Sequence, residues 1–304
     1  MSKDQSRIYH IGYRPLARTG RPLSPIWPIA ENFIKTRWGN RATKLMLLVA
    51  GGVFFLHMSW LFIQLFGQKL GGTPAAMAGG IQAADIVGRT QDVLVRFLST
   101  QFYVAALMAG VIGGGVIADE RRIGALSVYF SRPVTRVQFI AGKVGAVLSI
   151  PVAVYVLPTL ILWIFALGLC QPSARLGLLA SGPSALLVST LGALLIATTV
   201  TALSATAIRA RTASILYAGA LITLTGIAES SVSVGQSWVG YVSPERLLRT
   251  LVMASQSSGT PLINEVLGPI KVNPSATLSA VALAAFILGS VAFLVHALSG
   301  EQGK

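Results

Sequence analysis

Charged residues are scarce in this chain. Only 11% of its 304 residues are charged and 53% are hydrophobic, whereas a typical soluble domain has about 25% charged residues. So little polar surface cannot cover a soluble globule of this size, which excludes an ordinary water-soluble domain. The composition therefore predicts that lipid surrounds much of the chain.

Cysteine and histidine are almost missing, which removes the usual metal and redox sites. Cys170 is the only cysteine, so the chain can form neither an intramolecular disulfide nor a cysteine-based metal site. A small apolar packing role suits this residue. The histidines are scattered and are expected to be packing or interface residues: His10, His57 and His296. We therefore expect no metal centre.

A nucleotide-binding site is missing too. The phosphate loop G-x-x-x-x-G-K-[ST] does not occur, because Gly142-Lys143 lacks both the earlier glycine and the following Ser or Thr. No acid–base pair and no Ser/His/Asp grouping stands out. The sequence predicts that the chain is not an enzyme, has no catalytic residue and binds no cofactor itself.

Long apolar runs dominate the chain instead. A helix that crosses the hydrocarbon needs about 20 apolar residues. The fifth run is short and rich in Thr and Gly, so it is either a span completed by Glu229 and the serines beyond it or a broken helix. The predicted fold class is an all-α membrane protein with six transmembrane helices. The six runs contain no Asp, Glu, Lys or Arg and comprise residues 45–66, 98–118, 144–169, 185–208, 212–228 and 278–298.

The basic residues predict the orientation of these spans. The net charge is +14, which in a soluble protein would suggest nucleic-acid binding. Here the basic residues lie between apolar runs, which favours contact with anionic membrane lipids, and no nucleic-acid partner is expected. Seventeen basic residues fall on one side of the membrane and seven on the other. The positive-inside rule places both termini in the cytoplasm of a multi-pass protein, expected in the bacterial inner membrane.

The segments outside the spans differ in character. Residues 1–44 form an N-terminal cytoplasmic segment that lacks the apolar core of a secretory signal, and residues 299–304 form a cytoplasmic tail. Residues 67–97 are a polar outer connection. The longest outer loop is 229–277. Within it Ser243-Pro244-Glu245 predicts the start of an amphipathic helix, and the loop either forms a small cap over the outer mouth or dips into the bilayer.

A second amphipathic helix is predicted at about residues 28–39, before the first span. Glu31 and Lys35 form an i,i+4 pair on its polar face. Such a helix either lies in the membrane interface or docks on a cytoplasmic partner. Its apolar face is formed by Ile29, Ala30, Phe33, Ile34 and Trp38.

Glycines and prolines mark two of the spans. Gly110 and Gly114 form a GxxxG pattern in the second run, which indicates close helix packing. Pro151 and Pro158 should kink the third span, because each removes a backbone donor. The kink is either a hinge or a bend that neighbouring helices satisfy.

The connection between the second and third spans has an unusual order of residues. The acidic pair Asp119-Glu120 is followed by Arg121-Arg122, and Gly124 precedes most of an apolar group. The helix should stop at Ser131-Arg132-Pro133, because the residue before a proline is pushed out of the α region. The apolar group contains Ile123, Leu126, Val128, Tyr129 and Phe130.

A new helix should begin directly afterwards. Thr135 and Gln138 have the spacing of a capping box, and the helix would continue into the third span. The connection is therefore predicted to form a short amphipathic helix between two spans. It either docks in the groove of a partner, so that its displacement moves both spans, or rests as a basic loop on lipid headgroups.

This connection resembles the type-2 permeases of ATP-binding-cassette transporters. The resemblance is carried by Ala118-Asp119-Glu120-Arg121-Arg122-x-Gly124-x-Leu126, by Ser131-Arg132-Pro133-Val134-Thr135-Arg136, and by Phe139 with Gly142-Lys143. The motif covers about 25 residues, whereas the layout of six spans and an N-terminal interfacial helix covers the chain. The resemblance implies the type-2 exporter fold, with a coupling helix at Asp119–Phe130 in the groove of an ATPase.

The resemblance also implies partners. Two cytosolic ATPase subunits, which bind ATP and Mg, would pair with this chain and with a second permease copy or paralogue. Membrane lipids surround the complex, and an extracytoplasmic protein is a further candidate. ATP-driven closure of the ATPases would tilt the permeases and move substrate outward. The charge-free runs favour an apolar cargo, which is lipid-like, peptide or drug-like.

Two other functions stay open. A membrane-embedded scaffold or assembly factor would share the six spans but would transport nothing. An ion-driven secondary transporter is disfavoured, since such proteins place ionisable residues inside the membrane and the six runs carry only His57 and His296.

Overall fold

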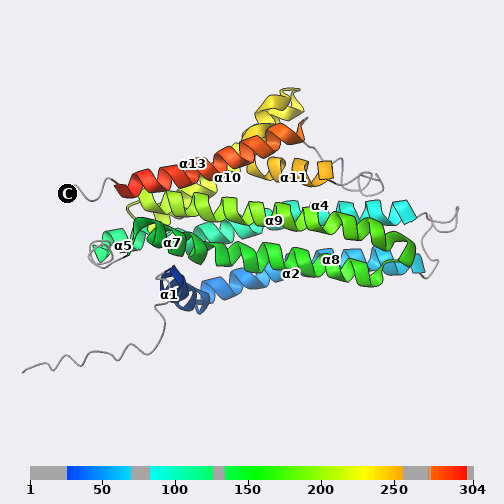
Figure 1. Cartoon of the computed structure of the whole chain (residues 1–304), viewed down its shortest axis with the longest axis horizontal. Helices are drawn as coiled ribbons and strands as arrows, with labels where there is room; N and C mark the ends of the chain where they lie inside the picture. The colour runs from blue at the N-terminus through cyan, green and yellow to red at the C-terminus, as the bar shows by residue number, and fades with distance from the viewer. Residues whose placement is uncertain (1–25, 70–82, 126–133, 256–272, 274, 300–304) are drawn as a thin grey trace, which may run out of the picture.

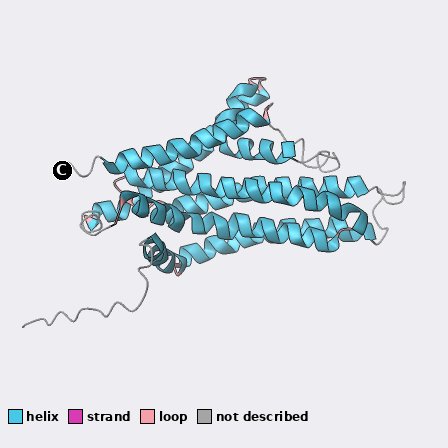
Figure 2. Cartoon of the chain, viewed as in Figure 1, coloured by secondary structure: helices cyan, strands magenta, loops and turns pink. Residues whose placement is uncertain are grey.

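The chain folds into a bundle of helices. The computed structural model describes residues 26–69, 83–125, 134–255, 273 and 275–299, and no strand occurs among them. Six of the described helices are long and apolar enough to cross a membrane, which confirms the predicted fold class (Figures 1 and 2). These spans are Arg41–Phe66, Val87–Arg122, Arg136–Leu169, Pro172–Thr206, Ala210–Ser233 and Ala276–Ser299.

Twelve elements make up the described part of the chain. The short α1 and α5 lie near one end of the long helices, and α11 lies alongside them (Figure 1). The elements are α1 (Ile26–Trp38), α2 (Arg41–Lys69), α4 (Ala83–Gly113), α5 (Ala118–Arg122), α7 (Arg136–Pro151), the π-helical η1 (Val152–Val156), α8 (Leu157–Leu169), α9 (Pro172–Thr206), α10 (Ala210–Ser233), the 3-10 helix η2 (Ser237–Val242), α11 (Pro244–Ser255) and α13 (Ala276–Ser299).

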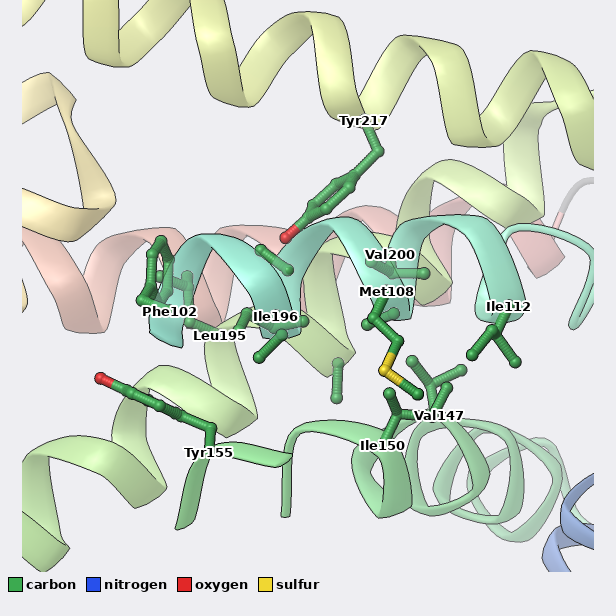
Figure 3. Close-up of a cluster of buried hydrophobic side chains, with 14 of the residues drawn as sticks. Phe102, Met108, Ile112, Val147, Ile150, Tyr155, Leu195, Ile196, Val200 and Tyr217 are labelled. Carbon is green, nitrogen blue, oxygen red and sulfur yellow. The ribbon is translucent and has the colours of Figure 1, made fainter. Parts of the chain in front are cut away.

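Helix α9 is at the centre of the bundle. It packs against α4, α7, α8, α10, α11 and α13. Its buried residues include many of the small Gly, Ala, Ser and Thr side chains that let helices approach closely in lipid. Figure 3 shows Ile196 of α9 in the core with Met108 of α4 and Ile150 of α7. In lipid the close fit of these side chains, rather than removal from water, holds the helices together.

Three predicted boundaries change. The fourth span was expected to begin at residue 185, but α9 begins at Pro172 and includes Arg175 and Pro183, which lie outside the charge-free run. Helix α4 begins at Ala83, so the second half of the expected outer connection 67–97 is helical. Phe97 and Leu94 of this extension are buried in a cluster with Leu61 of α2. The prediction began this span at residue 98 because it required a run without charged residues, and charged residues alternate with apolar ones in the extension before it. At the fifth span the helix continues unbroken to Ser233, which settles the choice in favour of a complete span.

Both prolines of the third span lie at irregular turns. Pro151 ends α7, and the π-helical turn Val152–Val156 follows before α8. Pro158 has no N–H, so the carbonyl of Val154 lacks its usual helical donor four residues on. The side-chain amide of Gln101 in α4 donates to this carbonyl at 2.6 Å. A hydrogen bond from the neighbouring helix therefore satisfies the carbonyl that the bend leaves without a backbone donor.

Candidate functional site

The junction between the second and third spans is anchored on α9. Four residues of turn follow α4 before α5 begins at Ala118. The backbone N–H groups of Ile117 and Ala118 donate to the hydroxyl of Ser204 in α9, at 3.0 and 3.2 Å. The same hydroxyl donates to the carbonyl of Gly114 at 2.8 Å. One buried serine therefore holds the start of α5 and the end of the second span together.

Two ion pairs connect the acidic residues of α5 to other helices. Arg37 of α1 donates from Nη2 to Oδ2 of Asp119 at 2.8 Å. Nζ of Lys143 in α7 donates to Oε1 of Glu120. The Lys143 side chain is 4% exposed and that of Glu120 is 20% exposed, so this pair is shielded from water. Lys143 also lies over the ring of Phe139, 5.4 Å from its centroid. Displacement of α5 would therefore act on α1 and α7.

Helix α1 packs along α7. Ile29, Ala30 and Phe33 are buried, and a side chain at Gly142 of α7 would come within 3.0 Å of Ile29. The other two predicted apolar residues, Ile34 and Trp38, are partly exposed. The amphipathic helix itself is present as predicted, and its location in the membrane interface stays a prediction.

The predicted coupling helix does not run unbroken from Asp119. Helix α5 ends at Arg122, and Gly124 takes a φ of +72°, which is a left-handed conformation that favours glycine. Ile123 is 70% exposed at this turn. The helix was expected to continue because the apolar spacing alone does not reveal a left-handed glycine. The other predicted residues of the segment lie outside the described residues: Leu126, Tyr129, Phe130, Ser131, Arg132 and Pro133.

The far side of the junction forms as the sequence predicts. The backbone N–H of Gln138 donates to Oγ1 of Thr135 at 3.3 Å, and that of Thr135 donates to Oε1 of Gln138 at 3.0 Å. This reciprocal capping box starts α7 at Arg136, and the helix continues directly into the third span.

The two predicted packing glycines both face α10. A Cβ at Gly110 would lie 2.7 Å from Tyr217, and one at Gly114 would meet the hydroxyl of Ser214. That hydroxyl donates to the carbonyl of Gly110 at 2.8 Å. The glycines therefore let α10 approach the backbone of α4 closely enough for an interhelical hydrogen bond.

A buried polar cluster around α11 was not foreseen. Helix α11 starts at Pro244 as predicted, yet it packs against α4, α9 and α13 instead of capping them. Nε of Arg249 donates to Oε1 of Glu245 at 2.7 Å. Nη1 of Arg246 donates to Oε1 of Glu229 in α10 at 3.1 Å, and its Nε donates to Asn273 at 3.4 Å.

This cluster places ion pairs in the interior that the sequence did not indicate. Glu245 and Arg246 are each 1% exposed, so charges do occupy the interior. The i,i+4 spacing of Glu245 and Arg249 is visible in the sequence, but nothing there shows that the charged face turns inward. The charge-free runs therefore no longer argue for an apolar cargo. The described residues contain no group of three or more His, Cys, Asp or Glu side chains that could hold a metal ion.

Comparison with known proteins identifies one family. The family model described as ABC-2 family transporter protein matches residues 30–299. None of the curated proteins compared with the chain matches it. The matched range includes all six spans, the junction around α5 and the buried α11.

Proposed function

The chain belongs to the ABC-2 transporter family, and from this premise we propose that it is the permease of an ATP-binding-cassette exporter. Membership makes it a multi-pass transmembrane subunit of such a transporter, distinct from the ATPase. The family works with ABC ATPase subunits. Two cytosolic ATPase subunits, which bind ATP and Mg, act here with this chain and a second permease copy or paralogue.

One observation carries the coupling role. The α5 junction is fixed to three neighbouring helices by buried or half-buried polar contacts, namely Arg37–Asp119, Lys143–Glu120 and the Ser204 hydroxyl. Rigid attachment of this kind transmits a displacement of α5 to the attached helices, because packed helices move as rigid bodies rather than deforming. A partner that moves the junction would therefore move the second and third spans together with α1.

The exposed end of α5 supports contact with a partner. Ile123 is an apolar side chain with 70% of its surface exposed at the tip of the junction. A partner that covered this side chain would remove its apolar surface from water. The ATPase would cover this tip, and its nucleotide-driven closure would drive substrate outward across the bacterial inner membrane.

A single-cysteine experiment tests sidedness and contact together. Cys170 is the only cysteine and is buried, so Cys170→Ser gives a cysteine-free background for Ile123→Cys. The matched control is Val234→Cys, which is 81% exposed after the outer end of α10. An impermeant maleimide should label position 234 in intact cells and position 123 only after permeabilisation. Position 123 should also crosslink to the co-purifying ATPase.

The same purified complex also distinguishes an exporter from the alternative, which is a scaffold or assembly factor. An exporter predicts that the purified complex hydrolyses ATP and that cargo changes the rate. Labelling of position 123 from outside would refute the topology. A complex that carries no ATPase at all would favour the scaffold.

A further inference from the structure

An apolar groove lies over the surface of α9. Its upper pocket, between α10 and α13, has a volume of about 120 Å³, and its lower pocket, lined by α9 and α13, has a volume of about 330 Å³. The two pockets adjoin each other, because they share Thr199 and Leu203 of α9 and Phe286 of α13. Tyr217 of α10 closes one wall, and Figure 3 shows its ring pointing from α10 toward α4. All three helices are membrane spans, so the groove lies at the depth of the hydrocarbon.

The size of the groove limits its occupant. Apolar cavities of about 150 Å³ stay dry and accept hydrocarbon, and an acyl chain has the required shape and polarity.

Two arginines lie where their positive charge would complement the headgroup of an anionic lipid. Arg209 directly precedes α10 and Arg211 lies in its first turn, at the cytoplasmic end; both are exposed and form no ion pair with any described residue. Asp119 comes close to this turn but is paired with Arg37. Along α10 the groove extends from Tyr217 to about 20 Å from Arg211, by the rise of a helix. One leaflet of hydrocarbon is about 15 Å thick, so a chain anchored near Arg211 reaches the groove.

We propose that the groove between α10 and α13 binds one acyl chain of an anionic inner-leaflet phospholipid whose headgroup contacts Arg209 and Arg211. This site goes beyond the proposed transport function. A lipid in the groove fills the space between two spans that contact each other little and joins both to α9. It would therefore set how far α10 and α13 separate.

The groove can be blocked without a clash. Gly289 lines the lower pocket, and a Cβ there would meet no atom within 4 Å. Gly289→Leu therefore fills the groove. Gly51→Leu is the matched control, because Gly51 is an exposed glycine of α2, away from the groove, with the same open surroundings. The leucine side chain takes the space of part of the acyl chain and removes its close contacts with the groove, which lowers the affinity for the lipid.

Native mass spectrometry of the purified full-length chain, with equal phosphatidylglycerol and phosphatidylcholine, measures the bound lipid. We expect bound phosphatidylglycerol in the unaltered chain and in Gly51→Leu, and loss of most of it in Gly289→Leu. Replacement of Arg209 and Arg211 by Gln should lower the preference for phosphatidylglycerol by about fivefold per arginine. Lipid retention by Gly289→Leu equal to the control would overturn the proposal. So would a change in dimer formation without loss of lipid, because a second copy would then occupy the groove.

Discussion

Replacement of Glu120 by Lys tests the buried contact between α5 and α7. The substitution removes the carboxylate partner of Lys143, whose side chain is 4% exposed, and adds a second positive charge beside it. Breaking a buried ion pair costs about 3–5 kcal/mol. Glu120 is itself 20% exposed, so solvent screens part of the effect and we expect about 3 kcal/mol. The cation–π contact of Lys143 with Phe139 remains and limits the loss.

The matched control is Glu31→Gln on the surface of α1. Glu31 pairs with Lys35 at 2.6 Å, but these side chains are 38% and 74% exposed. Exposed pairs contribute about 0–1 kcal/mol, so this variant should unfold almost normally. The double variant Glu120→Gln with Lys143→Met should recover much of the loss, because apolar groups often replace a buried pair at little cost.

Thermal unfolding in one fixed detergent measures the first outcome. A loss of about 3 kcal/mol corresponds to a fall of roughly 6 °C or more in the midpoint. In the assembled complex, ATP hydrolysis should continue while transport falls, since the junction no longer moves α7 with α5. If Glu120→Lys unfolds within 1 °C of the control and transports normally, the ion pair does not hold this junction.

Three further predictions test other parts of the structure. Leu126→Asp should preserve membrane insertion but separate ATP hydrolysis from transport, and normal coupled transport by the well-folded variant would contradict the docking role of this segment. Gln101→Leu should lower the unfolding midpoint by an amount equivalent to about 1–2 kcal/mol, because the Val154 carbonyl loses its donor; the added change Pro158→Ala should restore stability by returning the backbone N–H, and lack of rescue would refute this reason. Arg246→Met should destabilise the chain by about 3 kcal/mol and speed hydrogen exchange in α11, while unchanged exchange there would show that the ion pair to α10 does not hold α11.

The sequence determined the features that depend on local chemistry. Six spans follow from the length of the apolar runs, since a polar backbone in lipid must satisfy its hydrogen bonds within a helix. The start of α7 follows from the capping box of Thr135 and Gln138, and the start of α11 from Pro244, because the residues involved are adjacent in the chain. The resemblance to a family singled out the acidic pair at the junction as a candidate, but the sequence did not show which residues pair with it.

Only the tertiary structure decided which distant groups meet. Arg37 and Asp119 are 82 residues apart, and Ser204 is 87 residues from Ile117, so no local pattern pairs them. The inward face of α11 is likewise set by the packing of α4, α9 and α13, which buries charges that the sequence places in an outer loop. Secondary structure in lipid is dictated by hydrogen bonds within each segment, whereas the pairing of charges depends on how whole helices fit together.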